Sequence, residues 1–183
     1  TGGVQSEVVE QLDSLGQVVV ALDPKSIDEI LEAVRLTGKV TGSIEQAQQI
    51  TRDMEQRIKA VRDKLADLSP GEKVDTFVLV WIEDSKVFSA GPGTFVSSII
   101  SLAGGYNVAD ESKVEYPQYS IEKLMEKNPE VIISTAHGYS NPEQVKEDLH
   151  LDNLAADRND KDFIVKDSDL LTPAGQRIED GLE

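Results

Sequence analysis

Aromatic side chains are the residues in this chain whose placement most directly suggests ligand chemistry. The 183 residues include nine aromatics, and six of them fall at predicted strand ends or in loops: Trp81, Phe88, Tyr106, Tyr116, Tyr119 and Tyr139. Aromatic rings in loops above a parallel sheet line sites for large, flat or apolar ligands. Local packing of the loops is the alternative interpretation, and the sequence alone leaves both open.

A glycine-rich loop at 91–93 precedes a predicted helix, so a phosphate cradle has to be considered. The loop lacks the spacing of the Walker and dinucleotide fingerprints, and Pro92 removes one N–H donor. A tight turn that feeds a helix is therefore favoured. Ser97 and Ser98 fall inside that helix and do not match a nucleophile-elbow pattern, which argues against a serine hydrolase.

Few ionisable side chains occur in patterns that would do chemistry. His137 lies beside Tyr139 in a loop beyond a predicted strand, and a lone loop histidine is more typical of a ligand-edge residue than of a metal site. Asp167 and Asp169 could serve as paired carboxylates. Aspartate is also common after strands, so this pattern alone does not indicate catalysis. The sequence predicts no metal centre.

Alternating strands and helices position these candidates. Short apolar, β-branched runs at 17–22, 76–82, 130–134 and 162–165 alternate with helical patterns. This alternation predicts an α/β fold with a mostly parallel sheet covered on both faces. Ligands of such sheets bind beyond the carboxyl ends of the strands. Three of the four predicted strand ends follow residue 70, so we expect the site there.

One long helix is predicted over 43–68, without internal glycine or proline. Its apolar residues recur in steps of three and four, which places them in one stripe: Ile44, Ala47, Ile50, Met54, Ile58, Val61, Leu65 and Leu68. Ser43 and Gln46 suggest a capping box at its start. A helix of this length spans roughly 39 Å. The stripe is not a strict heptad, so we expect a strut between two bodies rather than a coiled coil.

The predicted elements divide the chain into three parts, namely a helix–strand–helix piece, the bridging helix and a second α/β body: 1–41, 42–69 and 70–183. A single strand cannot form a sheet, so the first part should expose apolar surface. We therefore expect a dimer through residues 1–41. We also expect the long helix to be covered from Val61 to Leu68, and Ile44 and Ala47 to be exposed or covered by a second copy.

Composition narrows the function classes. The net charge of −16, from 34 acidic and 18 basic residues, argues against nucleic acid and anionic membranes as partners. The absence of cysteine excludes disulfides and thiolate metal sites. No apolar run is long enough to cross a bilayer. The chain opens at Thr1 rather than at Met, and we expect it to be a fragment of a longer protein.

Four sequence blocks together resemble a known family: TFVLVWI at 76–82, FSAGPGTFVSSIISLAGGYNVA at 88–109, YPQYSIEKLMEKNPEVII at 116–133 and DLLTPAGQRIEDGLE at 169–183. The chain resembles the class III ABC-transporter solute-binding proteins that carry cobalamin, haem and iron–siderophore complexes. Residues 1–41 resemble the tail of this family's first lobe. Most of that N-terminal lobe is absent from the sequence.

This resemblance implies a Rossmann-like three-layer lobe, joined by the long helix to the remnant of another lobe. It implies a non-enzymatic protein without a cofactor, which captures a metal-chelate nutrient and delivers it to an ABC-transporter permease. The implied location is extracytoplasmic, either in the periplasm or as a cell-surface lipoprotein. Among the solutes, the lack of a basic cluster in the loops favours cobalamin, and iron–siderophore complexes or haem stay open.

The resemblance also assigns roles to individual residues. Phe88 and Tyr116 fall where the cobalamin-binding member places ligand-facing aromatics, and Asp169 falls where that member has a ligand-contacting aspartate. Glu122 falls at the exposed glutamate that docks to arginines of the permease. The first helical turn suits this role, because the helix dipole holds a carboxylate there in its charged form.

Three further residues complete the candidate ligand site. Trp81 lies near the end of the predicted strand at 76–82, and His137 or Tyr139 as an axial ligand would favour haem. The alternative from another class is a small α/β enzyme or nucleotide-binding domain that uses the loop at 91–93.

Overall fold

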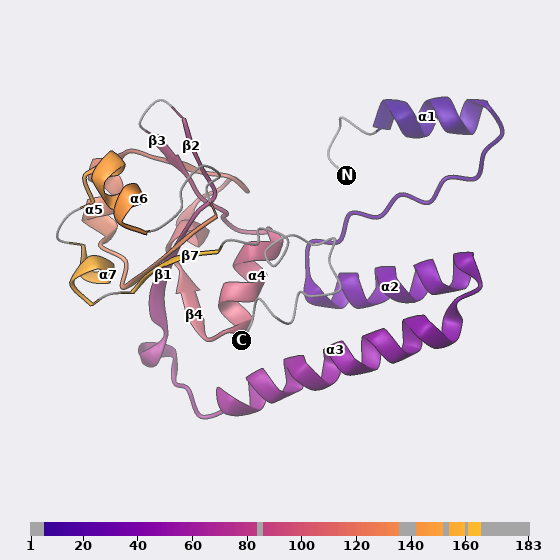
Figure 1. The fold of residues 1–183 in the computed structure, drawn as a ribbon, viewed down its shortest axis with the longest axis horizontal. Coiled ribbons are helices and arrows are strands. Elements are labelled where there is room, and N and C mark those ends of the chain that lie inside the picture. Colours follow the sequence, from indigo (N-terminus) through magenta and orange to yellow (C-terminus); the bar gives the residue numbers. More distant parts are fainter. Residues whose placement is uncertain (1–5, 84–85, 136–141, 152–153, 160, 166–183) are drawn as a thin grey trace.

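The computed structural model describes residues 6–83, 86–135, 142–151, 154–159 and 161–165 (Figure 1). The helices are α1 Ser6–Ser14, α2 Ile27–Thr41, α3 Ile44–Lys64, α4 Phe95–Leu102, α5 Ile121–Lys127, α6 Pro142–Leu149 and α7 Ala155–Arg158, with short 3-10 turns η1 Pro70–Glu72 and η2 Val108–Glu111. The strands are β1 Val74–Leu79, β2 Trp81–Glu83, β3 Lys86–Phe88, β4 Gly105–Asn107, β5 Gln118–Tyr119, β6 Val131–Ser134 and β7 Asp162–Ile164.

Two sheets organise the second part of the chain. The first is fully parallel in the order β4-β1-β6-β7, and the second is antiparallel in the order β2-β3-β5. The run 76–82, predicted as one strand, is divided between them. Val80 lies at the division, and its backbone N–H donates to the carbonyl of Phe88, which starts the hairpin. The α/β prediction with a mostly parallel sheet is confirmed.

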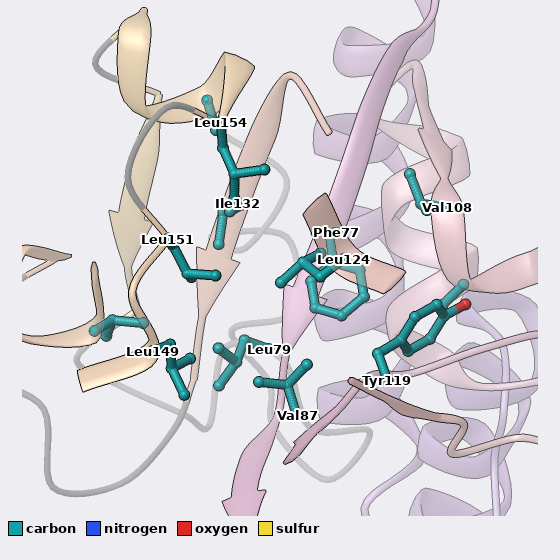
Figure 2. Close-up of a cluster of buried hydrophobic side chains, with 13 residues drawn as sticks. Phe77, Leu79, Val87, Val108, Tyr119, Leu124, Ile132, Leu149, Leu151 and Leu154 are labelled. Carbon is teal, nitrogen blue, oxygen red and sulfur yellow. The ribbon is translucent and has the colours of Figure 1, made fainter. Parts of the chain in front are cut away.

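The parallel sheet is covered on both faces. Figure 1 shows α4 against one face, with α2 and α3 beyond it, and α5, α6 and α7 toward the other side. Side chains alternate along β1, so Phe77 and Leu79 enter one cluster of buried residues while Val78 points to the opposite face. Figure 2 shows this cluster, to which Leu124 of α5 and Ile132 of β6 also belong.

The helices α2 and α3 form an antiparallel pair that packs on α4. Their apolar side chains make one cluster with Phe95 and Ile99 of α4. A glycine allows the two helices to approach closely, because a Cβ at Gly38 would lie 2.3 Å from the Cβ of Ala47. Ala47 is buried for this reason, contrary to our expectation, whereas Ile44 is 48% exposed, as expected.

The long helix ends earlier than predicted, at Lys64 instead of Leu68. It begins at Ile44 without the predicted cap, since the side chain of Ser43 makes no capping hydrogen bond. Beyond Lys64 the chain tightens into i to i+3 hydrogen bonds, for example from Leu65 N to Arg62 O at 3.2 Å. This turn brings Leu65 and Leu68 against Gly104, so the expected coverage at this end is confirmed.

One strand prediction was wrong. No strand is present at 17–22, where Val18 is 96% exposed and Val20 is 45% exposed. Within the described residues no neighbouring strand lies beside this run, so its backbone has no ladder to join. The helix expected near the C-terminus falls outside the described residues.

Candidate functional site

Three aromatic side chains gather on the hairpin sheet. Trp81 of β2 and Phe88 of β3 are direct cross-strand partners, with ring centroids 4.4 Å apart and planes only 14° from parallel. Tyr116 lies 5.8 Å from Trp81 at an interplanar angle of 42°. Trp81 is 37% exposed and Tyr116 is 51% exposed. This aromatic cluster of Trp81, Phe88 and Tyr116 therefore offers a partly exposed apolar surface.

Backbone hydrogen bonds fix the loop that carries Tyr116. Ser89 N donates to Pro117 O at 3.0 Å, and Gly91 N donates to Glu115 O at 2.7 Å. Gly91 has to be glycine, because a Cβ there would lie 2.8 Å from the carbonyl oxygen of Val114. The glycine-rich loop thus supports the aromatic cluster, and the N–H of Gly91 donates its hydrogen bond within the protein.

Tyr119 and Tyr106, which were grouped with the loop aromatics, lie elsewhere. Tyr119 is only 7% exposed and contacts Phe77 edge-on, with centroids 5.2 Å apart. Burial raises the pKa of Tyr119 above its ordinary value of 10.0. Tyr106 is 43% exposed on β4, which belongs to the other sheet. Packing rather than ligand placement explains Tyr119.

A groove of about 750 Å³ lies between the start of α2, the C-terminal half of α3 and the helix α4. Its walls mix apolar residues such as Ile27 and Leu102 with polar ones, namely Lys25, Arg62, Thr94, Ser97 and Ser101. The groove does not include the aromatic cluster. Lys25 connects the two places, because its Nζ lies 2.7 Å from Oε1 of Glu115, next to Tyr116.

Ser97 has a structural role in the groove wall. Its hydroxyl donates to both carboxylate oxygens of Asp110, at 2.6 and 2.8 Å. Asn107 donates to the same carboxylate at 3.0 Å and to the carbonyl of Ala90 at 2.8 Å. These contacts anchor α4 to the turn after β4, which agrees with the prediction against a serine nucleophile.

Glu122 is exposed in the first turn of α5. Ser120 caps this helix, and its side chain accepts from Lys123 N at 3.2 Å. Hydrogen bonds from the backbone N–H of Glu122 and from Ser120 lower the pKa of this carboxylate. Within the described part of the chain, the α5 lysines pair with other carboxylates, Lys123 with Glu126 and Lys127 with Glu111. Glu122 therefore presents a charged carboxylate at the surface.

Three predicted ligand residues, His137, Tyr139 and Asp169, lie outside the described residues. Among the residues that are described, no group of three or more acidic, histidine or cysteine side chains could hold a metal ion. No helix in the same ranges is long and apolar enough to cross a membrane.

The sequence did not single out Lys25 or Glu115. They are 90 residues apart, and nothing in either local pattern marks the pair. Trp81, Phe88 and Tyr116, in contrast, were identified as candidates and lie together.

The parallel sheet with helices on both faces defines an α/β protein, and the aromatic cluster is its candidate ligand surface. Residues 2–170 match the family described as periplasmic binding protein. The chain belongs to this family. Its known relatives are named as binding proteins, not enzymes.

Three proteins illustrate what this chain is similar to in sequence or in fold. The vitamin B12-binding protein of Vibrio cholerae is 28% identical over 131 residues, which cover 72% of this chain and 46% of the relative. A possible iron-binding protein from Staphylococcus epidermidis superposes with a TM-score of 0.78 at 25% identity, covering 96% of this chain and 67% of the other. The periplasmic heme-binding protein of Roseiflexus sp. RS-1 has a TM-score of 0.81 at 22% identity, covering 97% and 68%. The chain spans about half the length of the curated relatives it matches.

Proposed function

We propose that this chain is part of the solute-binding component of an ABC importer, which captures a metal-chelate nutrient outside the cytoplasm and delivers it to a membrane permease. The aromatic cluster is the observation that carries this proposal. Stacked, exposed rings offer a corrinoid or porphyrin face a large apolar contact. Under this proposal 70–183 is the second lobe, 42–69 the bridge and 1–41 the remnant of the first lobe.

Cobalamin is the solute we favour. Its support is the name of the Vibrio cholerae relative, together with the charge balance beside the cluster. Lys25 is paired with Glu115, so the rim beside Tyr116 carries no net positive charge from this pair. An anionic siderophore would gain little from such a rim. Iron–siderophore complexes and haem are the alternatives. For haem, His137 or Tyr139 would supply an axial ligand.

We propose Asp169 as a further ligand residue and Glu122 as the permease contact. The support for Glu122 is its exposure, its lowered pKa and its place in the first turn of a helix. A charged carboxylate in this position suits a bidentate contact with an arginine. The cellular location that follows from this proposal is the periplasm, or the cell surface in the form of a lipoprotein.

A nucleotide-binding role is less well supported. It would need free N–H groups at 91–93, but Gly91 N donates to Glu115 O and Pro92 has none. Thermal stabilisation by ATP or NAD would revive this alternative.

Isothermal titration of the chain with cyanocobalamin, haemin and a panel of ferric siderophores tests the proposal. Binding of one metal chelate, weakened in Phe88→Ala and unchanged in Tyr106→Phe, is the expected result. Tyr106→Phe is a matched control because it alters an exposed aromatic outside the cluster. Absence of binding to every metal chelate, in this chain and in a longer form with a complete first lobe, would contradict the proposal.

A further inference from the structure

An ion pair joins the segment before α2 to the loop that carries Tyr116. Lys25 Nζ lies 2.7 Å from Glu115 Oε1, and both side chains are about half exposed. Lys25 is held from the other side as well, because its backbone N–H donates to the Glu29 carboxylate at 2.7 Å. The pair thus ties the start of α2 to a loop that is distant in the sequence.

The position of Glu115 makes this contact relevant to the aromatic cluster. Glu115 directly precedes Tyr116, and its carbonyl accepts from Gly91 N. Its carboxylate lies over the turn at Gly93, where an added Cβ would be 3.9 Å from Oε1. The backbone at 115–117 is therefore fixed on the side of the glycine-rich loop, and Lys25 holds the Glu115 side chain that projects from it.

Lys25 remains charged over the working pH range. The hydrogen bond to Glu115 raises the pKa of Lys25 above its ordinary value, and Asp23 and Tyr116 also interact with its charge. In a chain with a net charge of −16, a carboxylate without this cation would be repelled by its surroundings. The Glu115 side chain would then lose its preferred position, and Tyr116 beside it would be held by the backbone hydrogen bonds of the loop alone.

We propose that Lys25 and Glu115 are positioning residues for the ligand site: their ion pair holds Tyr116 against Trp81 and so lets the segment before α2 set the geometry of the aromatic cluster. The relevance to ligand binding rests on the proposed function. The geometric claim does not, because it can be tested in the free protein.

Trp81 is the only tryptophan of the chain, so its fluorescence reports on the cluster without any ligand. The emission maximum and lifetime of Trp81 would be measured in Lys25→Met, in Glu115→Gln and in the exchange of both residues, Lys25→Glu with Glu115→Lys. Lys59→Met is the control, because it breaks another exposed ion pair, with Asp63 on α3. Circular dichroism would verify that all variants are folded.

Each single substitution is expected to shift the Trp81 emission to the red by a few nanometres, as Tyr116 moves away and water reaches the indole. The exchange should restore at least half of the shift, and Lys59→Met should cause none. Unchanged emission in both single variants would overturn the proposal, and so would an exchange that restores nothing. A failure of the proposed function would look different. The fluorescence results would then be as expected for the Lys25–Glu115 ion pair, but the chain would bind no metal chelate.

Discussion

Two apolar runs of similar composition have opposite fates in this molecule. Val131–Ser134 forms the strand β6 between β1 and β7, with Ile132 only 4% exposed. The run at 17–22 forms no strand, and Val18 is almost fully exposed. The difference is not in the local pattern. A strand is stable only where neighbouring strands satisfy its backbone and a packed layer covers its side chains.

The largest expected effect on stability comes from a truncation in the buried sheet, where β1 pairs with β6. Leu79→Ala should lower the free energy of unfolding by about 2–5 kcal/mol, because it opens a cavity in the cluster around β1. Val18→Ala, which also truncates an aliphatic side chain but in the exposed run, should change the free energy of unfolding by less than about 0.5 kcal/mol. Urea unfolding followed by circular dichroism measures both. Equal effects at the two positions would contradict the contrast.

Gly38→Ala tests how closely α2 and α3 are packed, which decides whether the buried part of the molecule includes this helix pair. Alanine normally stabilises a helix relative to glycine, but here the new Cβ would meet Ala47 Cβ at 2.3 Å. We expect a net loss of about 1–3 kcal/mol in the free energy of unfolding, because the α2–α3 pair is overpacked. The double variant Gly38→Ala with Ala47→Gly should recover part of the loss. A stabilised Gly38→Ala protein would show that the two helices are less closely packed.

Self-association would show whether the exposed run at 17–22 is covered by a second copy of the chain. We propose a dimer through residues 1–41, supported by the exposure of Leu15, Val18 and Val20. Introducing lysine at both valines should weaken the dimer at least about tenfold, because charges would enter an apolar contact. Sedimentation velocity over a concentration series measures this. A strictly monomeric wild-type chain at high concentration would refute the dimer.

The smallest expected effect is a change in the pH dependence of stability that comes from the buried Tyr119. The pKa of Tyr119 is raised by burial, so the folded state favours the neutral phenol. Its contribution to stability is complete below pH 10.0, the ordinary pKa, and is lost as the pH rises through the folded pKa. The urea midpoint should therefore fall more steeply above pH 10 in the wild type than in Tyr119→Phe. Parallel pH profiles would show that Tyr119 does not titrate differently in the folded state.

Much of the fold could be predicted from sequence where local signals and packing agree. Ser120 caps α5, as its place before that helix indicates, because a serine side chain there can accept from the N–H groups that have no partner within the helix. The alternation of strands and helices after residue 70 also gave the correct layers. The missing cap at Ser43 and the absent strand at 17–22 could not be foreseen, since both depend on what lies beside them in space.

The candidate site was predictable in its members but not in its geometry. The positions of Trp81, Phe88 and Tyr116 at strand ends marked them as candidates. Their stacking depends on the division of 76–82 at Val80, which no periodicity indicates. Tyr119 was placed in the same group and instead packs on Phe77, because its strand turns that side chain into the core.

Binding of a metal chelate at the aromatic cluster is the central proposal for this protein. Isothermal titration with cyanocobalamin of the wild type, Trp81→Ala and Tyr106→Ala tests it most directly, since the two variants remove exposed aromatics of similar exposure from different sheets. Loss of one stacking ring is worth about 1.4 kcal/mol, so Trp81→Ala should bind about tenfold more weakly while Tyr106→Ala binds like the wild type. Equal affinities in all three proteins would contradict the claim.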